Sequence, residues 1–519
     1  MSTSDNSDVP LPVNFERLVD SVLSKKPVLK KIVEKYGHKT LHEYAQDYID
    51  VNRGPGFAKR QNEFLAVFRK SIVRLLGKDT ANAATQQLKK RYFVSTADHH
   101  GPVTSPFFIN GNLVTAVPYF GNPDPLLRYI IVLSCGNVSL NNSSYPRGLL
   151  FTAYEKERII NHKVSFFPAS DRLCPVFEFR SYTADDINNA KKNINEKVRI
   201  GELGRPYANK IGGILDEIYL NPEVLGCKTF SEQVTKTNFN LWQKFFEPSH
   251  VTPPDLIYLE QEKLVMELLQ TKHFDQDTVI RHILFDEDFD VLMKKYFDGI
   301  QGAFDLEKKL GTYLFWALPK GSKYRIQLWR SGGELVSEDG NYRVKLTPEG
   351  LREAFGRKEL IPSMMLCYIV LSFYYGIKCL GGFSQVNYLT EMKDAYIKMQ
   401  TDRGYYRSVE VCARAQTKEM GGDFALAFLK CPNGKIIPAT GIDLVLYGAP
   451  DTWSRLVHKS DVLTMKEAVY SLMPEFYKIV YPEKDRDPEL SAINSEDATR
   501  ILNLEGKLEP CAEIKKEDG

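Results

Sequence analysis

The chain has 519 residues, about three times the ~150 that usually form one domain, and 43% of them are hydrophobic and 26% charged. This composition excludes a fibrous chain and a disordered chain. The 68 basic and 66 acidic residues give a formal charge of +2, which argues against a surface that neutralises nucleic-acid phosphates. We therefore expect two or three packed cores and no nucleic-acid partner.

The start of the chain, MSTSDNSDVPLPVNF, is polar and acidic, whereas a secretory signal has a basic start and an apolar run. The eight cysteines form no CxxC pair, which predicts reduced thiols. The most apolar stretch, 364–377, has about 14 residues against the ~20 that cross a membrane. It predicts a buried helix, closed by Lys378 and the Gly381-Gly382 pair. We expect a cytoplasmic protein without membrane contact.

Residues 1–12 are predicted to form a disordered tail, and residues 13–85 a helical region, because apolar residues recur there at helical spacing. Residues 86–200 are predicted to begin an α/β core. Within it, a short strand after Arg91 and a second one at Tyr129–Cys135 both run into polar loops that contain glycine. This pattern indicates a parallel sheet with a site at the carboxyl ends of its strands.

Further along, strands are predicted at Leu149–Ala153 and Pro175–Arg180, and Thr183 with Asp186 predicts a capping box at the start of a helix. Residues 201–312 are expected to be a mostly helical connection. Alternating residues between Leu314 and Leu346 predict an antiparallel hairpin or meander. Residues 313–400 are predicted to contain the hairpin and the second part of the core, with a Gly-rich loop at 381–388. Residues 401–519 are predicted to form an α/β region with a charged tail.

The turn Asp98-His99-His100-Gly101 carries three adjacent ionisable side chains after the first predicted strand, where α/β proteins usually react. A DHH sequence at this place is also found in metal-dependent phosphoesterases, but a divalent ion needs more ligands, and residues 60–97 contain no Asp-x-Asp pair. A purely structural histidine pair is the third interpretation.

The loop 136–148 is rich in hydrogen-bond donors that could hold carboxylate, phosphate or sugar hydroxyl groups: Asn137, Asn141, Asn142, Ser143, Ser144 and Arg147. An ordinary surface turn would use the same residue types. Cys135, at the end of the second strand, is either a nucleophile beside the histidines or a small buried residue.

The run GGFSQVNY from Gly381 to Tyr388 precedes a predicted helix. Glycines at this place allow a ligand to approach closely and leave the first amides of the helix free to bind an anion. The same glycines could simply separate two helices. Neither a GxGxxG nor a Walker motif occurs in the chain.

The segment GGFSQVNYLTEMKDAY resembles the glycine-rich stretch of the cysteine-adding ligase of bacillithiol synthesis. The matching positions are Gly382, Asn387, Tyr388, Glu391 and Lys393, and Gln385 stands where the family carries a glutamate. The order of the surrounding pieces is also similar: a hairpin, LTPEGLRE and ELIPSMM precede this segment.

Nearer the N-terminus, STADHHGPVTSPFF stands at the place of the family's Gly-Gln-Gln loop. Gly101 and Pro106 match, Asp98 and His99 replace two glutamines, and Asn112 replaces a lysine. The chain departs from the family at GNVSLNN, which replaces an acidic, histidine-containing loop, and in lacking the long C-terminal coiled coil.

The resemblance implies an α/β fold: a Rossmann-like core with a parallel sheet, attached helical regions and an antiparallel hairpin insertion. It implies a small-molecule ligase or transferase that joins an amine, such as that of cysteine or another amino acid, to an acyl or sugar-derived acceptor. His99 or His100 would be the general base, oriented by Asp98. The predicted substrate-binding residues are Gly101, Asn137, Asn141, Asn142, Arg147, Gln385, Asn387 and Tyr388.

A nucleotide (ATP or ADP) would bind at Gly381, Gly382, Ser384, Glu391 and Lys393. No metal ligand is assigned, and a homodimer is one option for the assembly. Two alternatives stay open: a metal-dependent hydrolase using Asp98, His99 and His100, and an inactive binding protein on the same fold. The enzymatic hypotheses require the turns near Asp98, Gly136 and Gly381 to meet around one cavity.

Overall fold

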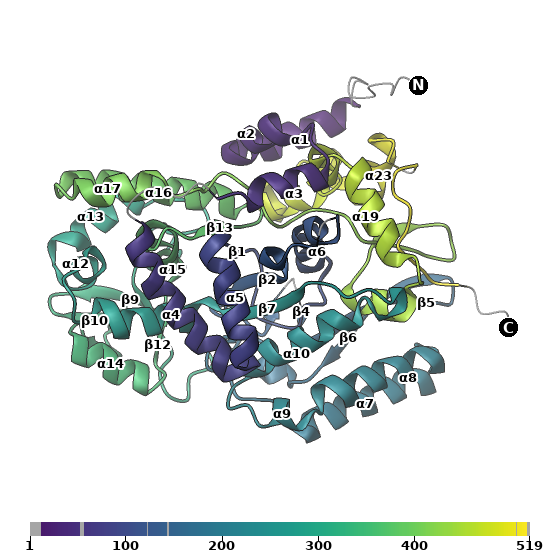
Figure 1. Ribbon diagram of the computed structural model, residues 1–519, viewed down its shortest axis with the longest axis horizontal. Coiled ribbons are helices and arrows are strands. Elements are labelled where there is room, and N and C mark those ends of the chain that lie inside the picture. Colours follow the sequence, from purple (N-terminus) through teal and green to yellow (C-terminus); the bar gives the residue numbers. More distant parts are fainter. Residues whose placement is uncertain (1–11, 52–56, 122, 143–144, 505, 516–519) are drawn as a thin grey trace.

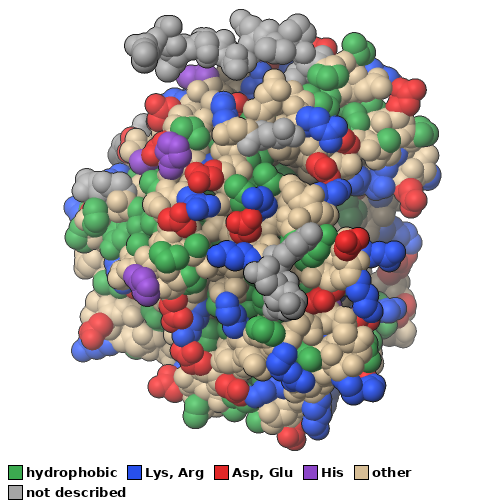
Figure 2. Space-filling model, turned by 90° about the vertical axis from the view of Figure 1, so that its right-hand side faces the viewer, with side chains coloured by type: hydrophobic (Ala, Val, Ile, Leu, Met, Phe, Trp, Pro, Cys, Tyr) green, Lys and Arg blue, Asp and Glu red, His purple; other side chains and the backbone are tan. Residues whose placement is uncertain are grey.

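The computed structural model describes residues 12–51, 57–121, 123–142, 145–504 and 506–515. The expected disordered tail therefore lies outside the described residues except for Pro12, as do Ser143, Ser144 and the last four residues of the charged tail. The protein is a mixed α/β structure with 53% helix and 16% strand. On the face drawn in Figure 2, acidic and basic side chains are interspersed, as the near-neutral net charge leads one to expect.

A four-stranded parallel sheet lies at the centre of the molecule (Figure 1). It contains β1 (Phe93–Ser95), β2 (Tyr129–Ser134), β7 (Asp255–Glu260) and β13 (Lys378–Leu380), in the order β13-β1-β2-β7. The two strands predicted from sequence, β1 and β2, are confirmed as neighbours. The other two were missed: β7 lies within the range expected to be mostly helical, and β13 contains Lys378, so the prediction that Lys378 closes a helix is wrong.

Both faces of this sheet are covered. Along β2, Ile130 and Val132 belong to one hydrophobic core, whereas Ile131 and Leu133 belong to a second core on the opposite face. Helix α4 (Phe57–Leu76) contributes to the second core and α6 (Pro106–Gly121) to the first. Strands buried on both sides read as continuous apolar runs, which is why YIIVLS could be recognised in the sequence.

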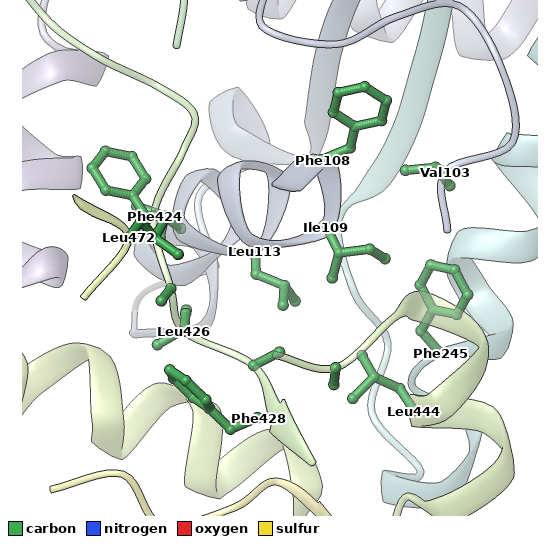
Figure 3. Packing of buried hydrophobic residues seen from close by; sticks show 14 of the residues in the cluster. Val103, Phe108, Ile109, Leu113, Phe245, Phe424, Leu426, Phe428, Leu444 and Leu472 are labelled. Atoms are coloured by element: carbon green, nitrogen blue, oxygen red, sulfur yellow. The ribbon is translucent and has the colours of Figure 1, made fainter. Parts of the chain in front are cut away.

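Helix α6 is clamped between the sheet and the C-terminal part of the chain. Figure 3 shows Ile109 and Leu113 of this helix facing Leu426, Phe428 and Leu444. Burying side chains of this size contributes roughly 1.5–3 kcal/mol each. The packing fixes the position of the turn between β1 and α6, which carries Asp98 and His99.

A second, antiparallel sheet contains β8 (Phe315–Ala317), β9 (Ile326–Ser331), β10 (Glu334–Ser337), β11 (Arg343–Lys345) and β12 (Leu360–Pro362). Its order is β11-β10-β9-β8-β12, so the first four strands form a meander. The meander expected between Leu314 and Leu346 is confirmed. The apolar stretch that follows is buried, as expected, and forms α15 (Met364–Tyr368) and a π-helical turn (Ile369–Tyr374).

The predicted strand at Leu149–Ala153 is part of β5 (Gly148–Glu155), which pairs with β6 (Arg158–Ser165). The predicted strand at Pro175–Arg180 is wrong, because only its two end residues form isolated bridges. The capping box of Thr183 and Asp186 is confirmed at α7 (Ala184–Arg199). None of the described helices is both long and apolar enough to span a membrane.

The remaining elements surround the two sheets (Figure 1). Before β1 come α1 (Val13–Lys25), α2 (Pro27–Tyr36), α3 (Leu41–Ile49) and α5 (Lys78–Lys90). Between β2 and β8 come β3 (Asn141–Asn142), β4 (Tyr145–Pro146), α8 (Arg205–Ile214), α9 (Pro222–Leu225), α10 (Phe230–Lys244), α11 (Gln261–Leu268), α12 (Val279–Phe285) and α13 (Asp288–Phe297). Helix α14 (Pro348–Gly356) precedes β12, and after β13 come α16 (Gln385–Asp402), α17 (Tyr406–Ala413), β14 (Phe428–Lys430), β15 (Ile436–Pro438), α18 (Gly441–Tyr447), α19 (Thr452–Val462), α20 (Met465–Tyr470), α21 (Met473–Val480), α22 (Pro488–Ala492), α23 (Ser495–Ile501) and β16 (Ala512–Glu513).

Candidate functional site

The turns after β1, β2 and β13 meet around one cavity of about 380 Å³. Asp98 and His99 follow β1, Cys135 and Asn137 follow β2, and the segment 382–385 follows β13. All three strands are parallel neighbours, so their carboxyl ends share one edge of the sheet, where ligands of α/β proteins usually bind. We call this space the inner cavity. The juxtaposition that the enzymatic hypotheses require is present.

The opposite wall of the inner cavity comes from segments in which the sequence analysis predicted no site residue. They are the loop 302–312, the antiparallel sheet, the start of α15 and the loop before β14. The main side chains from these segments are Leu310, Thr312, Trp316, Arg325, Met364, Met365, Tyr368 and Asp423.

Asp98, on the strand-end side, is the more deeply buried of the two acids in the described lining of the inner cavity, with 2% of its surface exposed. Its Oδ2 accepts a hydrogen bond from Asn112 Nδ2 at 3.0 Å. Burial raises the pKa of Asp98 to about 7, and hydrogen bonds from Asn112 and Tyr258 offset part of this rise. A carboxyl group with such a pKa exchanges its proton near neutral pH.

Asp423 is a second carboxyl group on the inner cavity, and its negative charge adds to the rise in the pKa of Asp98. Its backbone is left-handed, with φ of 60°, and its Oδ2 accepts a hydrogen bond from Phe383 N at 2.8 Å. Burial raises the pKa of Asp423 to about 6. A Cβ atom at position 382 would clash with the Asp423 carboxylate, so Gly382 is needed to make room for it.

His99 also lines the inner cavity and is partly buried. Its Nδ1 lies 3.3 Å from Asn142 Oδ1, and its ring meets the edge of Phe108. Burial lowers the pKa of His99, so the ring is neutral at pH 7.

His100 does not line the inner cavity and is fully buried. Its Nδ1 lies 2.7 Å from Ser134 Oγ and its Nε2 lies 3.0 Å from the Ser231 carbonyl, while its ring stacks on Tyr258. Burial lowers its pKa to about 3. The neighbouring Gly101 is also part of the core, because its carbonyl accepts from Asn238 Nδ2 at 2.9 Å. These contacts make His100 a structural residue, in contrast to the expected general base.

Replacing His100 with alanine is expected to lower the free energy of unfolding by about 2–4 kcal/mol, because it leaves a hole and removes two buried hydrogen bonds. Chemical denaturation measures the change. The matched control is His458→Ala, since His458 is exposed on α19, and an exposed substitution should stay within about 0.5 kcal/mol. Equal stabilities for the two variants would contradict the structural assignment.

Some residues of the polar loop after β2 face the inner cavity, and others lie at the surface. Asn137 lines the inner cavity and accepts hydrogen bonds from Arg325 through its carbonyl and its side chain. Asn142 reaches His99, whereas Asn141 is exposed. Arg147 is outside the cavity lining, has a left-handed backbone and bonds to Ser165. The anion grip expected from Arg147 is therefore not at this cavity.

Part of the Gly-rich loop faces the inner cavity. Ser384, Gln385 and Tyr388 line it, and Gln385 Nε2 donates to Thr96 Oγ1 at 2.5 Å. Gly381 is not in the lining, and its neighbour in space is the Gln385 side chain. Asn387 instead accepts from Val28 N at 2.8 Å and so holds the start of α2.

Two further residues predicted to bind the cofactor lie farther along α16 and outside the cavity lining. Glu391 is exposed. Lys393 donates to the carbonyls of Ala413 and Ala415, both at 2.8 Å. Lys393 therefore ties α16 to the end of α17.

Cys135 Sγ donates to Glu262 Oε1 at 3.2 Å, and the same carboxylate accepts from the backbone of Gly136 and Asn137. Burial, followed by the charge of Glu262, raises the pKa of Cys135 well above its ordinary value. The thiol stays protonated at pH 7, and a protonated thiol is a poor nucleophile. Cys135 therefore acts as a hydrogen-bond donor that helps to fix the turn after β2.

Among the residues that the structure describes, no three His, Cys, Asp or Glu side chains come together as a group that could hold a metal ion. No protein-family model matches the chain, and no curated protein matches its sequence. The chemistry available at the site is that of its own residues. They include two carboxyl groups whose pKa values are raised toward neutral pH, one guanidinium group and an aromatic wall.

Proposed function

We propose that this protein is a small-molecule ligase or transferase that joins an amine-bearing substrate, such as an amino acid, to an acyl or sugar-derived acceptor in the inner cavity. Counted along the chain, the order β7-β2-β1-β13 is third, second, first, fourth. This is also how the strand order of Rossmann-like sheets begins, and their ligands bind where that order reverses. We include that fold in the proposal, because the inner cavity contacts the turns after both β1 and β13.

The observation that carries the proposal is the pair of carboxyl groups, Asp98 and Asp423, with pKa values raised to about 7 and about 6. An amine is protonated at neutral pH and must lose a proton before it can attack an acyl carbon. A base whose pKa lies near the working pH does this best. In the proposed step one ammonium proton passes to Asp98, and the freed nitrogen lone pair forms a bond to the acyl carbon. The bond from that carbon to the leaving group breaks, and the leaving group departs with the bonding electrons and takes up the second N–H proton.

The amides of the Gly-rich loop do not fit the predicted nucleotide well. Phe383 N, which a phosphate would be expected to use, is already bonded to the Asp423 carboxylate at 2.8 Å. Glu391 and Lys393 lie outside the lining. A phosphate at this loop would meet a negative charge, so we derive no step through a nucleotide.

A thermal-shift screen of amino acids, acyl donors, sugar acids and nucleotides tests the proposal. A ligand at a hundred times its Kd adds about 2.7 kcal/mol of stability. Ser384→Trp, which fills the inner cavity, should abolish the shift, whereas Ser454→Trp on the exposed face of α19 should preserve it. The ligands that bind are then assayed in pairs for formation of a joined product.

Two results would count against the proposal. One is that no amine or acyl compound stabilises the protein; the other is that Ser384→Trp binds such compounds as well as the unaltered protein does. Hydrolysis of phosphoesters with added divalent metal, without joining of two substrates, would instead favour the hydrolase alternative.

A further inference from the structure

Arg325 precedes β9 and lines the inner cavity opposite the strand ends. Its guanidinium group lies over the ring of Trp316, 4.6 Å from the ring centroid. Its Nη1 donates to the carbonyl and the side-chain oxygen of Asn137. Within the described part of the chain, Arg325 forms no ion pair with a carboxylate, and the carboxylate whose charge acts on it is that of Glu262.

A second hollow of about 560 Å³ lies beside the inner cavity, and we call it the outer groove. Its lining includes Lys309, Gln327, Ser337, Glu338 and Asp339. Arg325 and Trp316 belong to the linings of both spaces. The stacked pair therefore stands at the junction of the two hollows, where a ligand longer than the inner cavity would have to pass.

The free edge of the Arg325 guanidinium has the geometry of an anion site. A guanidinium group carries five N–H donors, and only Nη1 has an acceptor among the described residues. Its Nε–H and one Nη2–H are parallel, and a carboxylate accepts such a pair through its two oxygens. The stack on Trp316 and the bonds to Asn137 hold the group in place, so little side-chain entropy is lost on binding.

We propose that Arg325 binds a carboxylate group of the substrate at this junction, and that the rest of the ligand extends over Trp316 into the outer groove. This inference rests on the proposed function, because it assumes that the reacting end of the ligand lies at Asp98 and Asp423. It adds the chemical class of one ligand: a carboxylic acid longer than the inner cavity.

The surrounding charges favour a carboxylate over a phosphoryl group. A phosphoryl group carries about −1.5 to −2 charges at pH 7, and Arg325 is the one unpaired cation in the two linings described. Lys309 in the outer groove is paired with Glu338 at 2.5 Å. Asp339 on one side, with Asp98 and Asp423 on the other, would repel the second charge of a phosphoryl group.

Titrations with acetate, succinate and orthophosphate test this site, followed by calorimetry and by tryptophan fluorescence. Succinate should bind more tightly than orthophosphate. Arg325→Gln should weaken succinate binding about 10- to 100-fold, and Arg325→Lys, which keeps the charge but loses the paired donors, should fall between. The matched control is Arg147→Gln, outside both linings, which should bind succinate as the unaltered protein does.

Equal binding of succinate by the unaltered protein and Arg325→Gln would overturn the inference, as would tighter binding of orthophosphate than of succinate or an absence of carboxylate binding. Should Arg325→Gln fail to fold, the affinity of Arg325→Lys for succinate is the test: weaker binding than in the unaltered protein supports the inference, and equal binding overturns it. Asp98→Asn separates this inference from the proposed function: loss of product formation with succinate binding retained supports both. If Arg325→Gln forms product at the normal rate, the carboxylate-site inference fails and the proposed function stands.

Discussion

Asp98→Asn is expected to lower the rate of product formation by about 10²–10⁴-fold, the contribution usual for a general base. An asparagine oxygen at this position can still accept from Asn112, so the cavity keeps its shape. The measurement is kcat and kcat/KM for the substrates that the thermal-shift screen identifies. In the unaltered protein the rate should rise with pH up to about 7, because the base works only when deprotonated and the pKa of Asp98 is raised to about 7.

The pH profile separates a base from a residue that only shapes the cavity. In Asp98→Asn the rise toward pH 7 should disappear, together with most of the rate. Asp394→Asn is the control, since Asp394 is an exposed aspartate on α16 and its loss should leave rate and profile unchanged. A pH profile of Asp98→Asn that parallels that of the unaltered protein would show that another group is the base.

The parts of the fold that could be predicted from sequence have strong local patterns. Strand β2 is a run of apolar residues that ends in a polar loop, and the meander β8–β11 alternates and turns at glycines. Strand β13 has only three residues, Lys378–Leu380, and directly follows the buried apolar stretch, so no periodicity separates it from a helix. Strand β7 lies between two helices and follows a proline-containing loop, and its six residues form too short a pattern to be separated from the helices around it.

The candidate site could be predicted only where its residues are adjacent in the chain. Asp98 and His99 were found because ionisable residues cluster after a strand. His100 was assigned the same role, but its ring is buried in the core, where it bonds to Ser134 and to the Ser231 carbonyl, and these partners are distant in the sequence. Asp423 and Arg325 belong to no motif, and only folding brings them to the strand ends. Their contribution depends on three-dimensional neighbours, which one sequence does not reveal.

Asp98→Asn is also expected to stabilise the protein by about 4 kcal/mol at pH 8 and by very little at pH 4. Burial raises the pKa of Asp98 from 3.8 to about 7, and a shift of one pKa unit corresponds to about 1.36 kcal/mol. Between these two values the folded protein holds a proton that the unfolded chain has lost, so stability falls as pH rises and levels off above about pH 7. Asparagine has no such proton.

Denaturation curves at half-unit steps from pH 4 to pH 8 measure this effect as the difference between Asp98→Asn and the unaltered protein. The difference should grow through that window, whereas the difference for the control Asp394→Asn should stay flat. A constant difference for Asp98→Asn would mean that the carboxyl group is not forced to keep its proton by burial.

Asp443 is a second buried aspartate, and the effect of Asp443→Asn on stability can be compared with that of Asp98→Asn. Burial also raises the pKa of Asp443, to about 6, but this carboxylate accepts from Thr152 N at 2.7 Å, Thr152 Oγ1 at 2.9 Å and Thr440 N at 2.9 Å. An asparagine there would turn its NH₂ group toward a donor, so Asp443→Asn should destabilise the protein by about 1–3 kcal/mol. Among the described residues no backbone N–H is bonded to the Asp98 carboxyl group, whose partners are the side chains of Asn112 and Tyr258, and removing this group relieves an unfavourable charge. Replacing a carboxylate that serves the chemistry and not the fold should raise the stability of the protein and lower its activity. Asp98→Asn is expected to do both.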